Sequence, residues 1–498
     1  MNVIKKNIVA NFGGGIWTGL MSFVFIPLYI KFMGIEAYGL VGVFATLLAL
    51  LSMLDMGFIH TLNREMARMS VFENSAKEMR DLLRTLEIPY WLMAIIVGGS
   101  VIALSPLIAY KWVNPKSLSP ATIQRAIIIM GLVMGCQWPL GFYSGGLLGL
   151  QRQVLLNIIN AVMATFRGLG TVLILWLVSP TIEAFFSWQI IISLTHTGIV
   201  MFFLWHSLPA SSQKPCFRRD LLLKIWRFAA GVTGITVLAT ILTQVDKVIL
   251  SRLLNMEMFG YYTLAYFVAV TPLYRLISPV FSAISPRMNN LVALGDQEGL
   301  KKLYHKSAQL VSVLVLPAAI VVALFSKEIL LLWTRDPITV ERTHMLVSII
   351  IIGTALNGIL TIPYVLQLAA GWTRLTFLVC FFSLPLLIPL IIALTRWYGA
   401  VGAAIVWVIL NGGQVLITVQ LMHRRLLSTE KWRWYCEDVA LPLTVALTVG
   451  IICRLLVPVP SGIVLGIIYL MMISSVVLSA TALSTPLTRQ WLYAKIRA

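Results

Sequence analysis

The sequence is dominated by apolar stretches, each about as long as a helix that crosses a bilayer. A spanning helix needs about 20 apolar residues, and such stretches recur along the whole chain. Of its 498 residues, 59% are hydrophobic and 11% are charged, whereas a soluble domain is typically about 25% charged. We therefore expect a polytopic membrane protein and exclude a secreted domain, a disordered protein and a cytosolic enzyme. The first stretch is too long for a signal-peptide core, so we expect it to be retained as a span.

The apolar stretches define the predicted topology. We count fourteen that are long enough to span a bilayer. The connecting segments are short, so we expect no soluble domain on either face and place the function within the bilayer. The predicted spans are 8–30, 37–59, 88–110, 123–148, 154–178, 184–207, 225–250, 259–284, 307–332, 342–368, 375–395, 400–423, 437–457 and 462–484.

The basic side chains gather on one side of the predicted membrane. The chain carries 38 Lys and Arg against 19 Asp and Glu, a formal net charge of +19. In a soluble protein this excess would suggest nucleic acid as a partner, but Lys and Arg concentrate in the cytoplasmic loops of membrane proteins. The loops on the side of both termini hold about four times as many of these cations as the other loops. We expect cytoplasmic termini and no nucleic-acid partner.

A nine-residue pattern recurs in the second half of the chain. Residues 31–39 (KFMGIEAYG) match 252–260 (RLLNMEMFG) at an offset of 221, and 149–152 (GLQR) loosely match 371–374 (GWTR) at an offset of 222. The offset of 222 also relates a polar face of the first predicted helix to a polar face of the seventh. Packing between helices is the simpler alternative for both faces, since small polar residues are common there. The faces are Asn11, Gly14, Thr18 and Ser22 in the first predicted helix and Thr233, Thr236, Thr240 and Gln244 in the seventh.

The offset corresponds to six predicted helices. Because six is even, both copies have the same orientation, and the interface of parallel repeats commonly holds a transported substrate. We predict an all-α integral membrane fold with two parallel six-helix repeats and two extra C-terminal helices. The predicted parts are an N-lobe at 1–208, a cytoplasmic linker at 209–223, a C-lobe at 224–423, and the last two helices with a cytoplasmic tail at 424–498.

Several charged side chains fall inside the predicted spans. A charge near the bilayer centre costs roughly 2.5–3.5 kcal/mol on insertion scales, so it needs a partner or a cavity. Arg167, Arg275 and Lys247 are candidates to line a cationic passage for an anionic group, because Arg offers a fork of donors to phosphate and Lys a point charge. The alternatives are structural ion pairs, with a distant carboxylate for Arg167 and with neighbouring Asp246 for Lys247.

Further polar residues complete the candidate site. Arg64 and Arg287 are first of all orienting charges and secondarily charges at a substrate entrance. Asp55 and Asp246 are candidates for coupling transport to a proton or sodium ion. The polar helix faces add Asn11, Thr18 and Thr240 as lining residues. Four aromatic residues could stack on sugars, although packing is their commoner role: Trp17, Trp138, Trp188 and Tyr266.

The motifs of other protein classes are missing from the sequence. No Gly-Lys dipeptide occurs, so a Walker A loop and a built-in ATPase are excluded. No Cys/His cluster suggests a metal. We expect no bound cofactor, and we expect the energy to come from a gradient, a substrate imbalance or a partner.

Four groups of residues, in this order and spacing, resemble a known family. They are Asn11 with the glycines after it, Pro27 and GIEAYGL at 34–40; LDMG at 54–57 with Arg64 and Ala67; GLQR at 149–152 with Asn157; and DKVIL at 246–250 with GYY at 260–262. The chain resembles the O-antigen flippase (Wzx-type) branch of the multidrug/oligosaccharidyl-lipid/polysaccharide exporter (MOP) superfamily. The last two helices carry little of this signature.

The resemblance implies two six-helix lobes around a central cavity and a defined task. A flippase of this kind moves an undecaprenyl-diphosphate-linked oligosaccharide, such as an O-antigen repeat unit of lipopolysaccharide, from the cytoplasmic to the periplasmic leaflet of the bacterial inner membrane. A polymerase and a chain-length regulator of the same pathway would be its partners. Arg167, Arg275 and Lys247 would then hold the diphosphate at successive depths while the lobes alternate access.

Three alternatives stay open. A multidrug exporter of the same superfamily would carry cationic drugs, for which a cationic cavity is a poor match. A peptidoglycan-precursor flippase of a sister family fits the hairpin motifs less well. An integral-membrane glycan polymerase or ligase ranks last, because those enzymes tend to carry a large periplasmic loop and the longest predicted outer loop, 111–122, is short.

Overall fold

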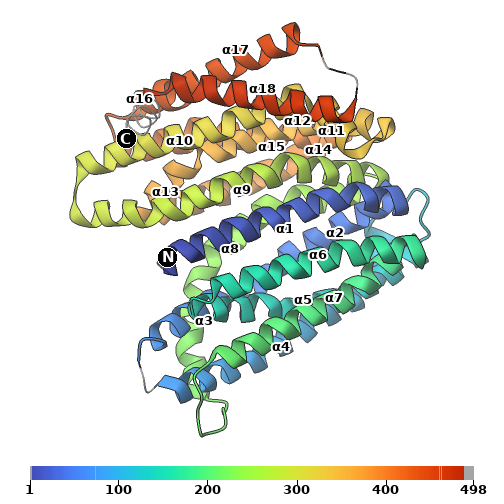
Figure 1. Ribbon diagram of the computed structural model, residues 1–498, viewed down its shortest axis with the longest axis vertical. Coiled ribbons are helices and arrows are strands. Elements are labelled where there is room, and N and C mark those ends of the chain that lie inside the picture. The colour runs from blue at the N-terminus through green and yellow to red at the C-terminus, as the bar shows by residue number, and fades with distance from the viewer. Residues whose placement is uncertain (1–2, 56, 73–74, 459, 461, 487–498) are drawn as a thin grey trace. The chain divides into compact units, whose positions relative to one another are not determined.

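The computed structural model describes residues 3–55, 57–72, 75–458, 460 and 462–486 (Figure 1). Contacts divide the chain into two compact units, Met1–Gly260 and Tyr261–Ala498. The helices that begin in the first unit are α1 (Val3–Met33), α2 (Ile35–Leu51), η1 (Ser52–Asp55), α3 (Phe58–Met69), α4 (Ala76–Leu107), η3 (Ile108–Trp112), α5 (Pro120–Gly149), α6 (Gln153–Leu177), α7 (Ile182–Ser207), α8 (Arg219–Leu253) and α9 (Met256–Leu294).

The second unit continues with α9 and adds the remaining helices. They are α10 (Gln297–Leu324), α11 (Ser326–Thr334), α12 (Pro337–Ile359), α13 (Thr361–Ala369), α14 (Thr373–Tyr398), α15 (Ala400–Leu426), α16 (Lys431–Arg433), η4 (Trp434–Ala440), α17 (Leu441–Leu456) and α18 (Ile463–Ser484). The lobe boundaries drawn from the repeat, which assign α8 to the C-lobe, remain a prediction.

The predicted spans coincide with helices. Thirteen helices among the described residues are long and apolar enough to cross a membrane, and α8 covers the remaining predicted span at 225–250. The prediction of an all-α polytopic membrane fold is confirmed. One boundary differs from the prediction: α2 ends at Leu51 and η1 at Asp55, so the predicted span 37–59 runs too far. The helix breaks at Gly57, whose φ of 76° lies in the left-handed region that favours glycine, and α3 begins at the next residue.

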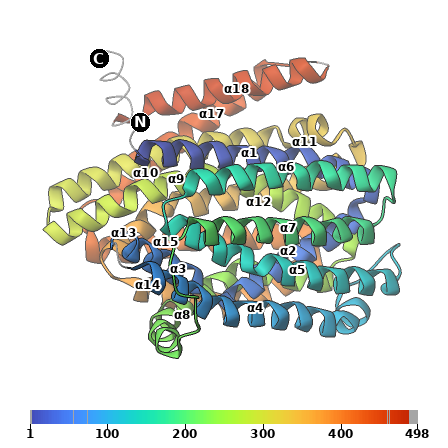
Figure 2. The same cartoon turned by 60° about the horizontal axis from the view of Figure 1, so that its bottom comes forward.

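In the first unit, long helices pack in pairs that are distant in sequence. α5 packs against both α4 and α7, and α1 packs against α6. Figures 1 and 2 show α4, α5 and α7 running side by side. Because most of each helix surface is apolar, these contacts leave only narrow polar faces in the interior. Those faces determine where a polar site can form.

The two copies of the repeated pattern contact each other reciprocally. A Cβ atom added to Gly39 would lie 2.5 Å from the main-chain oxygen of Met256. A Cβ atom added to Gly260 would likewise collide with the main-chain oxygen of Ile35. Gly39 corresponds to Gly260, and Ile35 to Met256, at the repeat offset of 221. Such an exchange of equivalent contacts is what a two-fold pseudosymmetry produces, and it gives the repeated glycines their physical reason.

In the second unit, α10 forms the centre of the packing. It contacts α12 on one side and η4, α17 and α18 on another. Figure 1 shows α17 and α18 running alongside α10. These helices share an apolar contact. It includes Ile320 of α10, Phe325 directly after α10, Ala446 of α17, and Tyr469 and Ile473 of α18. The last two helices are thus attached to the unit by a buried hydrophobic cluster.

Candidate functional site

A polar cavity lies inside the first unit. It has a volume of about 530 Å³, within the roughly 300–1,000 Å³ typical of small-molecule sites. Segments from α2 to α6 converge on it, because the turn at Gly57 brings η1 and α3 against α4 and α5. The polar and aromatic side chains among its walls are Asp55, His60, Tyr90, Gln137, Trp138, Ser144 and Asn160.

Asp55 is held in the wall of this cavity. The Tyr90 hydroxyl donates to Asp55 Oδ1 at 2.6 Å, and Tyr90 itself is buried. The Tyr90 ring stacks on Phe142 with a centroid distance of 4.8 Å. This packing fixes the hydroxyl, so the carboxylate keeps one defined position within a spanning region. The prediction that Asp55 is a coupling residue is not tested by this geometry.

Two buried polar atoms in the cavity wall have no hydrogen-bond partner among the described residues: Gln137 Oε1 and Trp138 Nε1. Both residues belong to α5 and line the cavity. Burying an amide oxygen or an indole N–H without a partner costs about 1–3 kcal/mol. Buried groups of this kind are normally satisfied by the protein or by ordered water. Both atoms are themselves buried, so the two residues line the cavity with their other atoms.

The Arg167 side chain does not line this cavity and faces α7. Its Nη2 is 3.4 Å from the Ser193 hydroxyl of α7. One turn further along α7, His196 Nε2 lies 3.0 Å from Asn160 Oδ1, in the cavity wall. Within the described part of the chain, no carboxylate lies within ion-pair distance of the half-buried guanidinium. The alternative of a structural ion pair for Arg167 finds no support there.

Lys247 and Asp246 form an ion pair. Lys247 Nζ is 3.1 Å from Asp246 Oδ1, and the two side chains are only 12% and 14% exposed. Nζ also donates to the Thr243 carbonyl at 2.9 Å, while the Thr243 hydroxyl donates to the Thr240 carbonyl. This ion pair supports the alternative interpretation of the sequence, in which Asp246 neutralises the charge of Lys247.

The polar face of α1 is used in helix packing. Asn11 Nδ2 donates to Gln153 Oε1 at 2.8 Å, and Asn157 Nδ2 donates to Asn11 Oδ1 at 2.6 Å. Thr18 donates back to the Gly14 carbonyl of its own helix. Asn11 thus joins α1 to α6, which favours the packing alternative for this face. The side chains of its predicted counterparts Thr233 and Thr236 lie outside the described part of the chain.

The remaining predicted cations are exposed. Arg64 contacts Glu65 with its Nη2 2.7 Å from Oε1. Arg275 and Arg287 both lie on α9 in the second unit and are exposed. The structure therefore connects Arg167 to the cavity that contains Asp55 only through α7, where His196 contacts Asn160 of the cavity wall. It does not gather all predicted cations in one unit.

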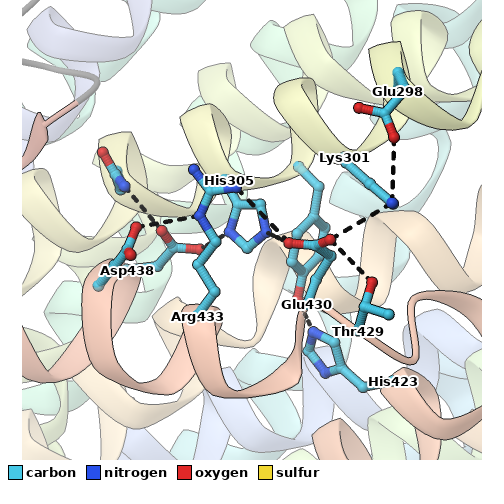
Figure 3. A network of polar contacts seen from close by, with 11 residues as sticks. Glu298, Lys301, His305, His423, Thr429, Glu430, Arg433 and Asp438 are labelled. Atoms are coloured by element: carbon cyan, nitrogen blue, oxygen red, sulfur yellow. Dashed lines mark hydrogen bonds and ion pairs between the residues drawn. The ribbon is translucent and has the colours of Figure 1, made fainter.

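A second polar cluster, which the sequence analysis missed, lies in the second unit (Figure 3). His305 of α10 is fully buried between two carboxylates: Nδ1 is 2.5 Å from Asp438 Oδ2, and Nε2 is 3.1 Å from Glu430 Oε2. Gln309 donates to the other Asp438 oxygen at 2.9 Å. Each ring nitrogen of His305 thus faces an oxygen of a different carboxylate.

Glu430 precedes the last pair of spanning helices and is stabilised in its charged form. Burial opposes ionisation, but hydrogen bonds from Thr429 and His305 and the nearby charges of His305 and Lys301 outweigh it and lower the pKa of Glu430. The sequence signal for this cluster is weak. His305 sits among lysines that are expected to orient the protein, and its partners lie more than a hundred residues away.

The fold is shared with solved transporters. The lipid II flippase MurJ, in an inward closed conformation, aligns over 96% of this chain and 98% of its own, with a TM-score of 0.67 at 14% identity. An inward-facing multidrug-resistance MATE family transporter of the MOP superfamily aligns over 85% of this chain and 96% of its own, with a TM-score of 0.64 at 12% identity. The chain therefore has the fold of these transporters.

The family follows from the sequence comparisons. A model described as polysaccharide biosynthesis protein matches residues 4–292, and a MatE model matches residues 234–392. A putative O-antigen transporter of Shigella flexneri is 19% identical over 408 residues, 82% of this chain and 94% of that protein. Because the first model covers more than half of the chain, the protein belongs to the polysaccharide biosynthesis protein family. The predicted resemblance is confirmed.

Proposed function

We propose that this transporter moves an undecaprenyl-diphosphate-linked oligosaccharide, an O-antigen or similar repeat unit, from the cytoplasmic to the periplasmic leaflet of the bacterial inner membrane. It does so by alternating access through a cationic cavity. The observation that carries the proposal is the half-buried guanidinium of Arg167 in the middle of α6, whose one hydrogen-bond partner among the described residues is the Ser193 hydroxyl. A diphosphate would supply the missing anion, and the name of the O-antigen relative agrees with this substrate.

Other candidate residues take secondary parts in this proposal. Arg275, and Arg64 and Arg287 near the cytoplasmic ends, contribute positive charge along the path of the headgroup. Lys247 can bind it only after its ion pair with Asp246 has opened, so this pair and Asp55 are the sites where a proton or sodium ion would couple to transport. A polymerase and a chain-length regulator would take the product on the periplasmic side.

Replacing Arg167 tests the proposal. We expect Arg167→Ala to abolish surface glycan in a strain that lacks the chromosomal gene, with lipid-linked repeat units accumulating on the cytoplasmic leaflet. Arg167→Lys keeps the charge and should retain part of the activity. The measurement is the labelled lipid-linked glycan accessible from each leaflet.

The control is Arg125→Ala, which removes a cation whose side chain is 67% exposed at the start of α5. It should leave transport intact. Normal surface glycan with Arg167→Ala at equal protein levels would contradict a diphosphate-binding role for Arg167.

A second candidate function is transport of a peptidoglycan precursor, which the structural similarity to the lipid II flippase favours. Both substrates would share a lipid diphosphate, so Arg167 serves either one. The two substrates differ in their glycan, so the identity of the transported glycan decides between the two functions.

A further inference from the structure

One loop contacts both copies of the repeated pattern. Each copy carries a glutamate at the same place, Glu36 in the first and Glu257 in the second, at the offset of 221. The function proposed above uses neither of them. Residues 112–118, which lie between α4 and α5, contact both glutamates and the main chain beside the second one. We call residues 112–118 the clasp.

The clasp is attached to the first copy through a buried carboxylate. Glu36, at the start of α2, is 8% exposed. Its Oε1 accepts from the main-chain N–H of Lys116 at 2.6 Å, and its Oε2 accepts from the main-chain N–H of Ser117 at 3.0 Å. The Ser117 hydroxyl donates to Oε2 as well. Hydrogen bonds to an ionised carboxylate are stronger than those between neutral groups, so this single side chain provides a firm attachment.

The clasp is attached to the second copy through the main chain. The Met256 N–H donates to the Asn114 carbonyl at 2.9 Å. Asn114 Nδ2 donates to the Arg252 carbonyl at 2.5 Å. Asn114 and Asn255 form an isolated parallel β-bridge. The clasp therefore pairs with the segment between α8 and α9 as a short strand would.

Two side-chain contacts flank this bridge. Trp112 Nε1 donates to the hydroxyl of Ser251, which is 5% exposed, at 2.9 Å. Lys116 Nζ lies 2.5 Å from Glu257 Oε2, but these two side chains are 62% and 28% exposed. An exposed ion pair contributes little to stability. The main-chain pairing, and not the ion pair, therefore holds the clasp on the second copy.

The place of the clasp gives these contacts a role in transport. It belongs to the outer loop 111–122 of the predicted topology, which is periplasmic if both termini are cytoplasmic. In alternating access the repeats move against each other, so contacts between them at one end must break before that end opens. We propose that the clasp keeps the periplasmic end closed, that Glu36 holds it there, and that its contacts break and re-form in each transport cycle. The proposal rests on the proposed function, because it requires alternating access.

A disulfide tests whether the clasp has to open. Asn114→Cys combined with Asn255→Cys places two thiols at the β-bridge, where the main chains lie close enough for a disulfide. The measurement is labelled lipid-linked repeat unit that reaches the periplasmic leaflet in spheroplasts of a strain that lacks the chromosomal gene. We expect a membrane-impermeant oxidant to stop transport and a membrane-impermeant reductant to restore it. Each of the two substitutions alone is a matched control and should transport under both conditions.

A second measurement reports the opening of the clasp without transport. Ser251→Cys places a thiol at a buried position that contacts Trp112, so its labelling by a maleimide requires the clasp to open. The rate is measured on the peptide that contains residue 251, in the purified full-length protein. Adding Glu36→Gln should raise this rate about 10-fold, as for the loss of one hydrogen bond to a charged group. Adding Lys116→Ala is the matched control and should raise it at most about 3-fold.

The outcomes separate the clasp from the proposed function. Unchanged transport with a closed disulfide would overturn the opening of the clasp, and so would transport that the reductant does not restore, since the substitutions would then act on the fold. A disulfide that does not close would overturn the periplasmic placement. Equal labelling rates with Glu36→Gln and Lys116→Ala would overturn the role of Glu36. If the unaltered protein moves no lipid-linked repeat unit, the proposed function fails, while the labelling rates still test the clasp.

Discussion

At the residue scale, the interior charges find partners in three different ways. Lys247 pairs with the residue beside it, His305 lies between two distant carboxylates, and Arg167 contacts a hydroxyl. The first pair could be named from the sequence because adjacent residues are always close. The partners of His305 could not, because they lie more than a hundred residues away, in a segment that the packing of η4 and α17 brings to α10. Arg167 was recognised from its mid-span position, while its lack of a carboxylate is a property of the packing.

His305 should be a strong determinant of stability. His305→Ala would leave Asp438, which is fully buried, without the imidazole nitrogen that contacts it. Removing one member of a buried ion pair typically costs about 3–5 kcal/mol. We expect a clearly lower midpoint of unfolding in detergent, measured by thermal denaturation of the purified protein. His206→Ala, on the exposed end of α7, is the control and should leave the midpoint nearly unchanged. Equal midpoints for the two variants would show that the cluster of Figure 3 does not hold η4 to α10.

At the scale of elements, the length and hydropathy of the apolar runs predicted the spans. The close approach of the main chain to Gly39 and Gly260 explains the glycines of the repeated pattern. The spans follow from apolar runs, which are local properties of the chain. The cavity follows from the break at Gly57, where one predicted span divides into α2, η1 and α3. The sequence did contain a signal for this break in the Asp-Met-Gly segment, but hydropathy alone extended the helix through it.

The repeated glycines should tolerate no side chain. Gly39→Ala and Gly260→Ala each place a methyl group against a main-chain oxygen that cannot move aside as a side chain would. Overpacking of this kind typically costs about 1–3 kcal/mol. Gly198→Ala on α7 is a matched control, since a Cβ there meets no atom within 4 Å, and alanine favours a helix by roughly 0.5–1 kcal/mol. We expect lower unfolding midpoints for the first two variants and an equal or higher one for the control. Equal stability of all three would refute the reciprocal contact.

At the scale of the whole molecule, the family defines a transporter, and a deletion distinguishes its candidate substrates. A deletion strain separates the candidates. We expect it to remain viable, to lose surface glycan and to keep its susceptibility to cationic drugs. The reference for drug susceptibility is a strain that cannot assemble the lipid-linked glycan, because loss of surface glycan by itself changes drug entry. Lethal depletion would support a peptidoglycan precursor as substrate, and greater drug susceptibility than in the reference strain would support a drug exporter.

The sequence by itself determined the class of fold, the number of spans, the repeat and the family, because apolar length, charge bias and motif spacing are properties of neighbouring residues. It also marked Arg167 and Asp55 as charges within predicted spans, and Trp138 as an aromatic residue that could stack on sugars. Only the tertiary structure decided which of them share a cavity, that Lys247 is neutralised, and that Asn11 is part of a helix contact. These depend on distances between residues far apart in the chain, which side-chain packing sets when the helices associate.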